Sequence, residues 1–186
     1  MKKTTIGVVV GSARRGSFSK IVAETIIGLM PEGFELRMLD IAELPLYNQD
    51  FDEEGKTPES YVRFRKEVAE SEAFLFVTPE HNRSVPALLK NALDIASRPM
   101  GSNVWSGKPG AIVSVSPGAI GGFGANHIAR QSMAFLNVFM MQQPEAYVGN
   151  VTDMIDANGK VTAERSLGFL KNIAESFAAW VKTFQK

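Results

Sequence analysis

Hydroxyl and guanidinium groups gather in one short segment near the start of the chain. Residues 11–19 read GSARRGSFS, which places Ser12, Ser17 and Ser19 around Arg14 and Arg15. Hydroxyls and guanidinium forks are donors that suit phosphate oxygens. Main-chain amides at a helix start add to them, because they have no partner within the helix and the helix dipole is positive there. The segment therefore predicts a phosphate-binding loop between a strand and a helix.

This segment differs from the commoner phosphate-binding loops. Gly11 and Gly16 do not have the spacing of a dinucleotide fingerprint, and no Gly-Lys-Ser or Gly-Lys-Thr follows them as in a P-loop. The plain alternative is a capped turn in which Ser17 begins the helix and both arginines are solvated. Phosphate binding is favoured because the segment is longer and more polar than a simple connection requires.

Two further segments have unusual compositions. Residues 79–86 read PEHNRSVP, and the two prolines restrict the backbone at both ends of the segment. Such a stiff loop could present its amides and the Asn82 side chain to the polar edge of a planar heterocycle. Residues 116–124 read SPGAIGGFG and offer accessible backbone. The alternatives are a surface turn before a helix for the first segment and ordinary tight turns for the second.

The elements that must position these segments follow from hydrophobic patterning. Buried or alternating apolar runs predict strands over residues 4–10, 34–39, 73–78 and 111–115, and a last strand that begins over 138–141. Helical patterns cover residues 18–30, 59–70, 86–97, 125–136 and 162–184. A polar connection spans residues 40–58.

The alternation of buried strands with helices predicts a parallel sheet covered on both faces. Five strands with five helices correspond to the flavodoxin-like α/β fold. No repeat, low-complexity tract or linker divides the sequence, so residues 1–186 are expected to form a single domain. All three unusual segments directly follow strands. Because the carboxyl ends of parallel strands share one edge of the sheet, we expect the three loops to converge there.

Composition narrows the classes of partner and compartment. Lys plus Arg and Asp plus Glu both total 20, which gives no electrostatic reason to expect nucleic acid or an anionic membrane as a partner. No apolar run reaches the roughly 20 residues of a membrane span, and the first residues lead into a strand and not a signal sequence. The absence of cysteine excludes disulfides and thiolate chemistry and favours a cytoplasmic location. His81 and His127 are the only histidines and lack metal-site spacing, so no metal is expected.

The three segments together resemble the NAD(P)H-dependent FMN reductase family, and within it the bacterial quinone and chromate reductases. The resemblance rests on GSARRGSFS, on TPEHNRSVPALLKNALDIASRP and on SVSPGAIGG, and it covers essentially the whole length. It implies a flavodoxin-like fold, FMN as the bound cofactor, NAD(P)H as the electron donor and a homodimer or homotetramer.

The resemblance also implies which residues contact FMN. Residues 12–19 would hold the phosphate, residues 79–82 would lie along the isoalloxazine ring, and a serine of the third segment would approach the ring. The implied contacts are Ser12, Ala13, Arg14, Arg15, Gly16, Ser17, Phe18, Ser19, Pro79, Glu80, His81, Asn82 and Ser116. Arg14, Ser17 and Ser19 would be the principal phosphate-binding side chains. A structural role near a subunit contact is implied for Lys90, Asn91 and Asp94.

The chain departs from the family pattern at three positions. His81 stands where the family usually has tyrosine, Arg83 where it has another aromatic or a small residue, and Ile95 where many members have tryptophan. Arg83 could attract the 2′-phosphate of NADPH, an anionic acceptor, or a carboxylate such as Glu145 of a neighbouring subunit. A solvated loop arginine is an equal alternative.

The leading functional hypothesis is an FMN enzyme that takes hydride from NAD(P)H and passes electrons to quinones or other small oxidised acceptors, such as chromate, azo compounds or free flavin. The flavin would carry the redox chemistry, so no protein acid, base or nucleophile is required. The alternative is a flavodoxin-like electron carrier, which the zero net charge disfavours because carriers are usually acidic. A phosphorylated receiver domain is excluded, because Gly11 and Ser12 stand where acidic residues are needed.

Overall fold

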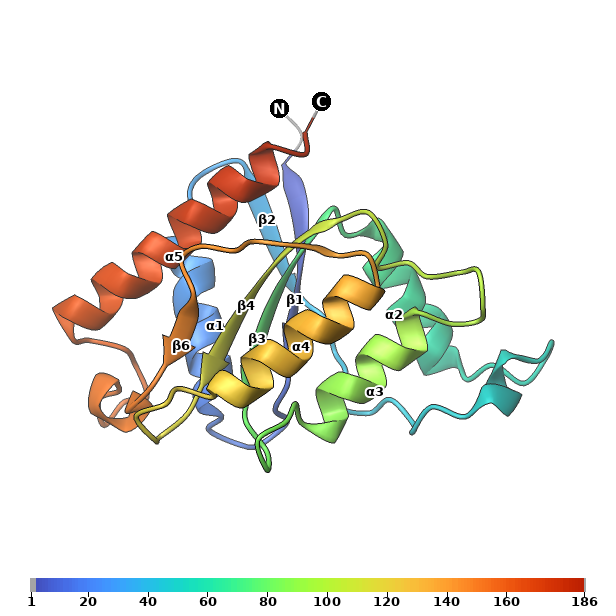
Figure 1. Cartoon of the computed structure of the whole chain (residues 1–186), viewed down its shortest axis with the longest axis horizontal. Coiled ribbons are helices and arrows are strands. Elements are labelled where there is room, and N and C mark those ends of the chain that lie inside the picture. The colour runs from blue at the N-terminus through green and yellow to red at the C-terminus, as the bar shows by residue number, and fades with distance from the viewer. Residues whose placement is uncertain (1–2, 186) are drawn as a thin grey trace.

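Strands and helices alternate along the chain in the computed structural model, which describes residues 3–185 (Figure 1). The strands are β1 (Thr4–Val10), β2 (Phe34–Met38), β3 (Ala73–Pro79), β4 (Pro109–Val115), β5 (Phe139–Met140) and β6 (Ala146–Val148). The helices are α1 (Phe18–Leu29), α2 (Glu59–Glu70), α3 (Ala87–Ala96), α4 (Phe123–Phe135) and α5 (Glu164–Lys182). Two short 3₁₀ helices, η1 (Gln49–Asp52) and η2 (Val151–Met154), lie in connections.

The strands form one parallel sheet in the order β2-β1-β3-β4-β5, and β6 also pairs with β4. The last strand position is therefore shared by two short pieces. Phe139 pairs with Pro109 at the start of β4, whereas β6 pairs with residues 113–115 at its end. Pro144 lies in the interruption between them, where a residue without an N–H cannot donate to the ladder. The predicted parallel flavodoxin-like sheet is confirmed, with its fifth strand divided.

Helices cover both faces of the sheet. The first core lies between the sheet and helices α1 and α5, and it contains Val8 and Phe177. The second core lies under α2, α3 and α4, where Val9 packs with Phe74 and the fully buried Trp105. Successive side chains of a strand point to opposite faces, so Val8 and Val9 enter different cores. This explains why β1 reads as an uninterrupted apolar run.

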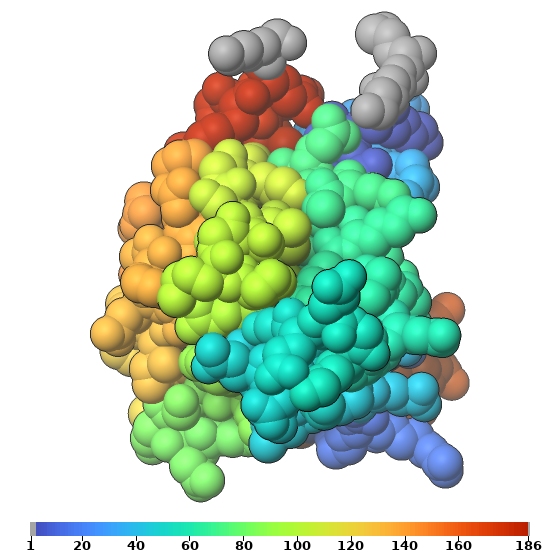
Figure 2. Space-filling view, turned by 90° about the vertical axis from the view of Figure 1, so that its right-hand side faces the viewer, coloured from blue at the N-terminus to red at the C-terminus, as the bar shows by residue number. Residues whose placement is uncertain are grey.

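The loops that follow β1, β3 and β4 meet at one edge of the sheet, the lower edge in Figure 1, as expected from parallel strands. The polar connection between β2 and α2 spreads as a teal surface across the side of the molecule that Figure 2 faces. None of the helices within residues 3–185 is both long enough and apolar enough to cross a membrane.

Candidate functional site

The loop between β1 and α1 owes its shape to two glycines. A Cβ on Gly11 would lie 2.7 Å from Thr78 Oγ1, so the backbone after β1 can lie this close to the end of β3 only because residue 11 is a glycine. Gly16 has a φ of +65°, which favours glycine, and it turns the chain toward the helix. Ser17 then caps α1, because its Oγ accepts a hydrogen bond from the Lys20 amide at 3.3 Å. The structure therefore contains the capped turn, and this cap is compatible with the predicted phosphate-binding loop.

Arg14 is held across its own loop. Its Nη2 donates to the Gly16 carbonyl at 2.9 Å, and its Cζ lies 5.0 Å from the centre of the Phe18 ring. A guanidinium has five N–H donors, so this arrangement fixes the group and leaves donors for a ligand. The hydroxyl-bearing Ser17 and Ser19 are buried below it.

The connection between β3 and α3 contains a tight two-residue turn. His81 and Ser84 exchange main-chain hydrogen bonds of 3.0 and 2.9 Å, and Asn82 and Arg83 have φ values of 51° and 65°. Two consecutive residues with positive φ are characteristic of a type I′ hairpin turn. Asn82 therefore lies at the tip of the turn.

The side chain of Glu80 ties this turn to the start of α4. Its Oε1 pairs with Arg83 Nη1 at 2.9 Å, and its Oε2 accepts a hydrogen bond from the Ala125 amide at 3.0 Å. The Glu80 side chain is only 10% exposed, whereas that of Arg83 is 74% exposed. The structure therefore pairs Arg83 with Glu80 of the same loop. Glu80 was not among the partners that the sequence suggested for Arg83.

Two glycines, Gly121 before α4 and Gly124 in its first turn, allow close packing. A Cβ on Gly121 would lie 2.8 Å from the carbonyl carbon of Tyr147, at β6. A Cβ on Gly124 would lie 2.8 Å from the Arg83 carbonyl oxygen and 2.9 Å from Glu80 Oε2. Because both positions are closed to larger residues, this third loop can lie against β6 and against the β3–α3 turn. Its Ser116 faces the space between the loops.

A cavity of about 690 Å³ opens between the three loops. This volume is in the range of ligand and cofactor sites. Most of the predicted contacts line it: Ser12, Ala13, Arg14, Ser17, Phe18, Ser19, Pro79, Glu80, His81 and Ser116. Arg15 and Gly16 instead line an adjoining cavity, and Asn82 lines neither.

Several residues that line this cavity were not predicted as site residues from the sequence: Gly11, Pro86, Ala87, Leu88, Val115 and Pro117. Gly11, Pro86 and Pro117 belong to the singled-out segments, so their position beside the site could have been found. Nothing in the sequence distinguishes Leu88 and Val115 from core residues, because an apolar residue at the end of a helix or strand is usually part of the core.

The chemistry of this cavity fits FMN. Arg14, the serine hydroxyls and the first-turn amides of α1 are donors of the kind that would hold the FMN phosphate. Leu88, Val115 and the prolines form apolar walls for a planar ring. Within residues 3–185, no group of three or more His, Asp or Glu side chains is placed to hold a metal ion.

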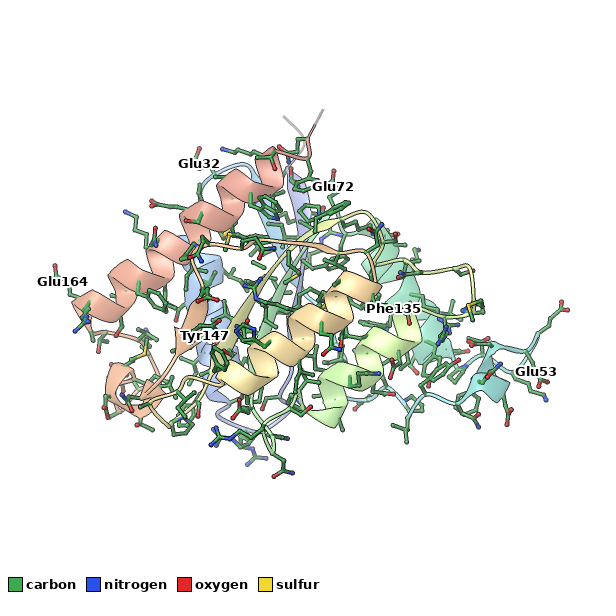
Figure 3. All side chains as sticks on the ribbon, in the orientation of Figure 1. Glu32, Glu53, Glu72, Phe135, Tyr147 and Glu164 are labelled. Carbon is green, nitrogen blue, oxygen red and sulfur yellow. The ribbon has the colours of Figure 1, made fainter. Side chains whose placement is uncertain are left out.

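A separate polar chain lies outside the cavity, beside the start of α4 (Figure 3). Tyr147 Oη donates to Glu145 Oε1 at 2.8 Å and lies 2.9 Å from His127 Nε2. Burial, reinforced by the bond to Glu145, raises the pKa of Tyr147 to about 12. Tyr147 thus stays protonated at neutral pH and links Glu145 to α4.

The residues of α3 expected to be structural have clear contacts. Asn91 is buried, accepts the Tyr47 amide at 2.7 Å and donates to the Pro45 carbonyl at 2.9 Å, so it fixes the β2–α2 connection. Lys90 Nζ pairs with Asp94 at 2.6 Å on the helix surface. Ile95 is fully buried in the second core and does not line the cavity.

Comparison with known proteins identifies the family. Residues 4–153 match the NADPH-dependent FMN reductase profile. The chain belongs to this family. A quinone reductase from Pseudomonas putida is 52% identical over 178 residues, which are 96% of this chain and 95% of that protein. A 2-hydroxy-1,4-benzoquinone reductase from Burkholderia is 46% identical over 95% of this chain and 96% of its own length.

Solved structures agree with this assignment. FerB, a flavoenzyme NAD(P)H:(acceptor) oxidoreductase from Paracoccus denitrificans, has a TM-score of 0.90 and 36% identity over 97% of this chain and 98% of its own. A flavodoxin from Pseudomonas aeruginosa, with a TM-score of 0.59 and 19% identity, shares the fold. These findings confirm the expected FMN-dependent NAD(P)H oxidoreductase and favour it over the electron-carrier alternative.

Proposed function

We propose that this FMN reductase family member reduces quinones with electrons from NAD(P)H. The observation that carries the proposal is the cavity at the carboxyl edge of the sheet, which all three loops line and which combines hydroxyl and guanidinium donors with apolar side chains. Relatives named as quinone and benzoquinone reductases at 52% and 46% identity support a quinone as the acceptor.

In this proposal the protein binds and orients, whereas FMN supplies the electron transfer chemistry when bound. Arg14, Ser17 and Ser19, which line the cavity, would hold the phosphate. Pro79, Glu80 and His81, which line the cavity before the tip of the β3–α3 turn, would border the ring. The Glu80 carboxylate keeps that turn fixed against α4 through its contacts with Arg83 and Ala125.

Steady-state kinetics test the proposal directly. The purified protein, loaded with FMN, should oxidise NADPH or NADH when a benzoquinone is supplied. Because donor and acceptor would use the same face in turn, double-reciprocal plots at several quinone concentrations should be parallel. A protein that binds FMN but accepts hydride from neither coenzyme would contradict the proposal and support an electron carrier.

We further propose that the chain acts in the cytoplasm as a homodimer or homotetramer. The outer face of α4 carries exposed apolar side chains, and further ones flank the helix in sequence: Phe123, Ile128 and Phe135, with Ile120 and Phe139. Several large exposed apolar side chains on and beside one helix favour a protein interface there. The stretch from Leu88 to Ile95, in contrast, is mainly core, since Leu89, Leu93 and Ile95 are buried.

A further inference from the structure

A second cavity adjoins the proposed FMN cavity at the carboxyl ends of β1 and β2. It has a volume of about 480 Å³ and shares Ser12, Ala13, Arg14 and Leu88 with the first. Its other walls come from the β1–α1 loop, the first turn of α1 and residues 38–42 after β2. Because the two cavities share a wall, a ligand with two ends could occupy both.

Cationic side chains border the second cavity. Arg14, Arg15 and Lys20 all line it. Within residues 3–185, the Arg15 guanidinium makes no hydrogen bond or ion pair with another residue, so its donors are available to a ligand. Lys20 Nζ lies 3.9 Å from Glu24 Oε1, but both side chains are more than half exposed and such pairs contribute little. Cations gathered on a concave surface favour an anion.

The opposite wall suits a nucleoside. Met38, Leu39 and Ile41 provide an apolar surface, and the Met38 side chain is 41% exposed. A flexible thioether adapts readily to a planar base. Asp40 lies on the same wall, with its Oδ1 accepting from the Ala42 amide at 3.0 Å. In dinucleotide-binding folds an acid at this position accepts a hydrogen bond from the ribose 2′-hydroxyl of NAD, so with NADPH only the free 3′-hydroxyl would be left to Asp40.

Asp40 is the one carboxylate among the residues given above for this cavity. Its Oδ2 lies 3.9 Å from Arg63 Nη1 of α2, but both side chains are about half exposed, so this pair also contributes little. Because Arg14 is assigned to the FMN phosphate, Arg15 and Lys20 are the cations left for a second ligand, and they outnumber Asp40 by one charge. Arg83, the other residue considered for a coenzyme phosphate, is already paired with Glu80.

We propose that the second cavity binds the adenosine 2′-phosphate end of NADPH, with Arg15 and Lys20 as the phosphate-binding side chains. The nicotinamide then reaches the first cavity across the shared wall at Arg14 and Leu88. This inference rests on the proposed function, because it concerns the electron donor of the same site. The proposal predicts that NADPH is preferred to NADH and that the second cavity determines this preference.

Coenzyme preference tests the proposal kinetically. Arg15→Ala and Lys20→Ala should each lower the ratio of kcat/KM for NADPH to that for NADH by about 5- to 50-fold, the effect of losing a partly exposed charged hydrogen bond. Lys171→Ala is the matched control, since Lys171 forms an equivalent surface pair with Glu175 at 3.8 Å on α5. Its ratio should equal that of the wild type. Equal losses with both coenzymes in the two test variants would overturn the proposal.

Equilibrium binding gives a second readout that does not depend on turnover. Calorimetry on the FMN-loaded protein should show binding of 2′-AMP that weakens in Arg15→Ala, together with much weaker binding of 5′-AMP. Inorganic phosphate should bind more weakly than 2′-AMP, because it lacks the nucleoside. Equal affinity for all three probes, or 2′-AMP binding unaffected by Arg15→Ala, would overturn the assignment. The flavin absorbance of each variant checks that FMN is retained.

The two proposals fail in different ways. If neither NADPH nor NADH reduces the loaded protein, the proposed function is wrong whatever the 2′-AMP result. If both coenzymes react but 2′-AMP does not compete with NADPH, the proposed function stands and the second cavity is not the coenzyme site.

Discussion

At the scale of single residues, the contrast between Arg14 and Arg15 is the sharpest feature of the site. Both belong to one polar loop, so the sequence could predict phosphate binding but not which arginine would face which ligand. The difference depends on the turn at Gly16, whose carbonyl accepts a hydrogen bond from Arg14. Only the folded loop shows that Arg14 lines both cavities and Arg15 only the second.

Arg14→Ala should weaken FMN binding by about 10- to 150-fold, because a hydrogen bond from a charged donor to phosphate contributes roughly 1.5–3 kcal/mol. The affinity for riboflavin, which lacks the phosphate, should change little in the same variant. Fluorescence titration of the apoprotein with both flavins measures the two effects. Arg15→Ala should weaken FMN binding less than Arg14→Ala. Equal losses of FMN and riboflavin affinity in Arg14→Ala would show that Arg14 supports the loop and does not contact the phosphate.

At the scale of elements, local signals placed the helices well and the last strand poorly. Helix α2 has the predicted bounds, since Pro58 precedes its first residue and an amphipathic pattern runs to its end. Strands β5 and β6 are only two and three residues long. Such short pieces exist because β4 is there to pair with them, and a local pattern cannot report a distant partner. The single strand predicted to begin over 138–141 therefore covers only the first piece.

The end of α2 also carries a pH-sensitive contact. Lys108 Nζ donates to the carbonyls of Val68 at 2.7 Å and Ala69 at 3.0 Å, in the last turn of the helix. Burial lowers the pKa of Lys108 from 10.5 to about 8. Between these pH values the unfolded chain binds more protons than the folded one, so the contribution of Lys108 to stability rises with pH.

The pH dependence can be isolated by comparison with Lys108→Met. The free energy of unfolding of the wild type, minus that of the variant, should increase as the pH rises from about 8 to 10.5. Urea denaturation across this range measures the difference. Lys171→Met, which alters a mostly exposed lysine of α5, serves as the control. The free energy of unfolding of the wild type, minus that of Lys171→Met, should not change with pH over this range. Parallel curves for the wild type and Lys108→Met would mean that Lys108 titrates alike in the folded and unfolded states.

At the scale of the whole molecule, topology made the site predictable. The loops after β1, β3 and β4 are far apart in sequence, yet a parallel sheet brings their ends to one edge. The contacts between the loops were not predictable in the same way. Glu80 reaches the Ala125 amide only because Gly124 lacks a side chain, and that fit depends on how α4 packs. The same limit applies to the second cavity, whose walls come from three separate segments.

The outer face of α4 leads to a prediction about assembly. Phe135, at the end of α4 in Figure 3, is 86% exposed, and Ile128 lies on the exposed side of the same helix. Burying such side chains against a second copy stabilises a dimer by roughly 1.5–3 kcal/mol per large apolar residue, and a symmetric interface counts each residue twice. Phe135→Glu should therefore weaken self-association by about 100-fold or more.

Leu46→Glu is the matched control, because Leu46 is also apolar and 78% exposed but lies on the β2–α2 connection, away from α4. Light scattering coupled to size exclusion should give an oligomeric mass for the wild type and for Leu46→Glu, and a smaller mass for Phe135→Glu. A monomeric wild type, or dissociation caused by Leu46→Glu and not by Phe135→Glu, would contradict an α4 interface. Since α4 begins at the Glu80 contact that fixes the β3–α3 turn, an interface along this helix would also brace that wall of the FMN cavity.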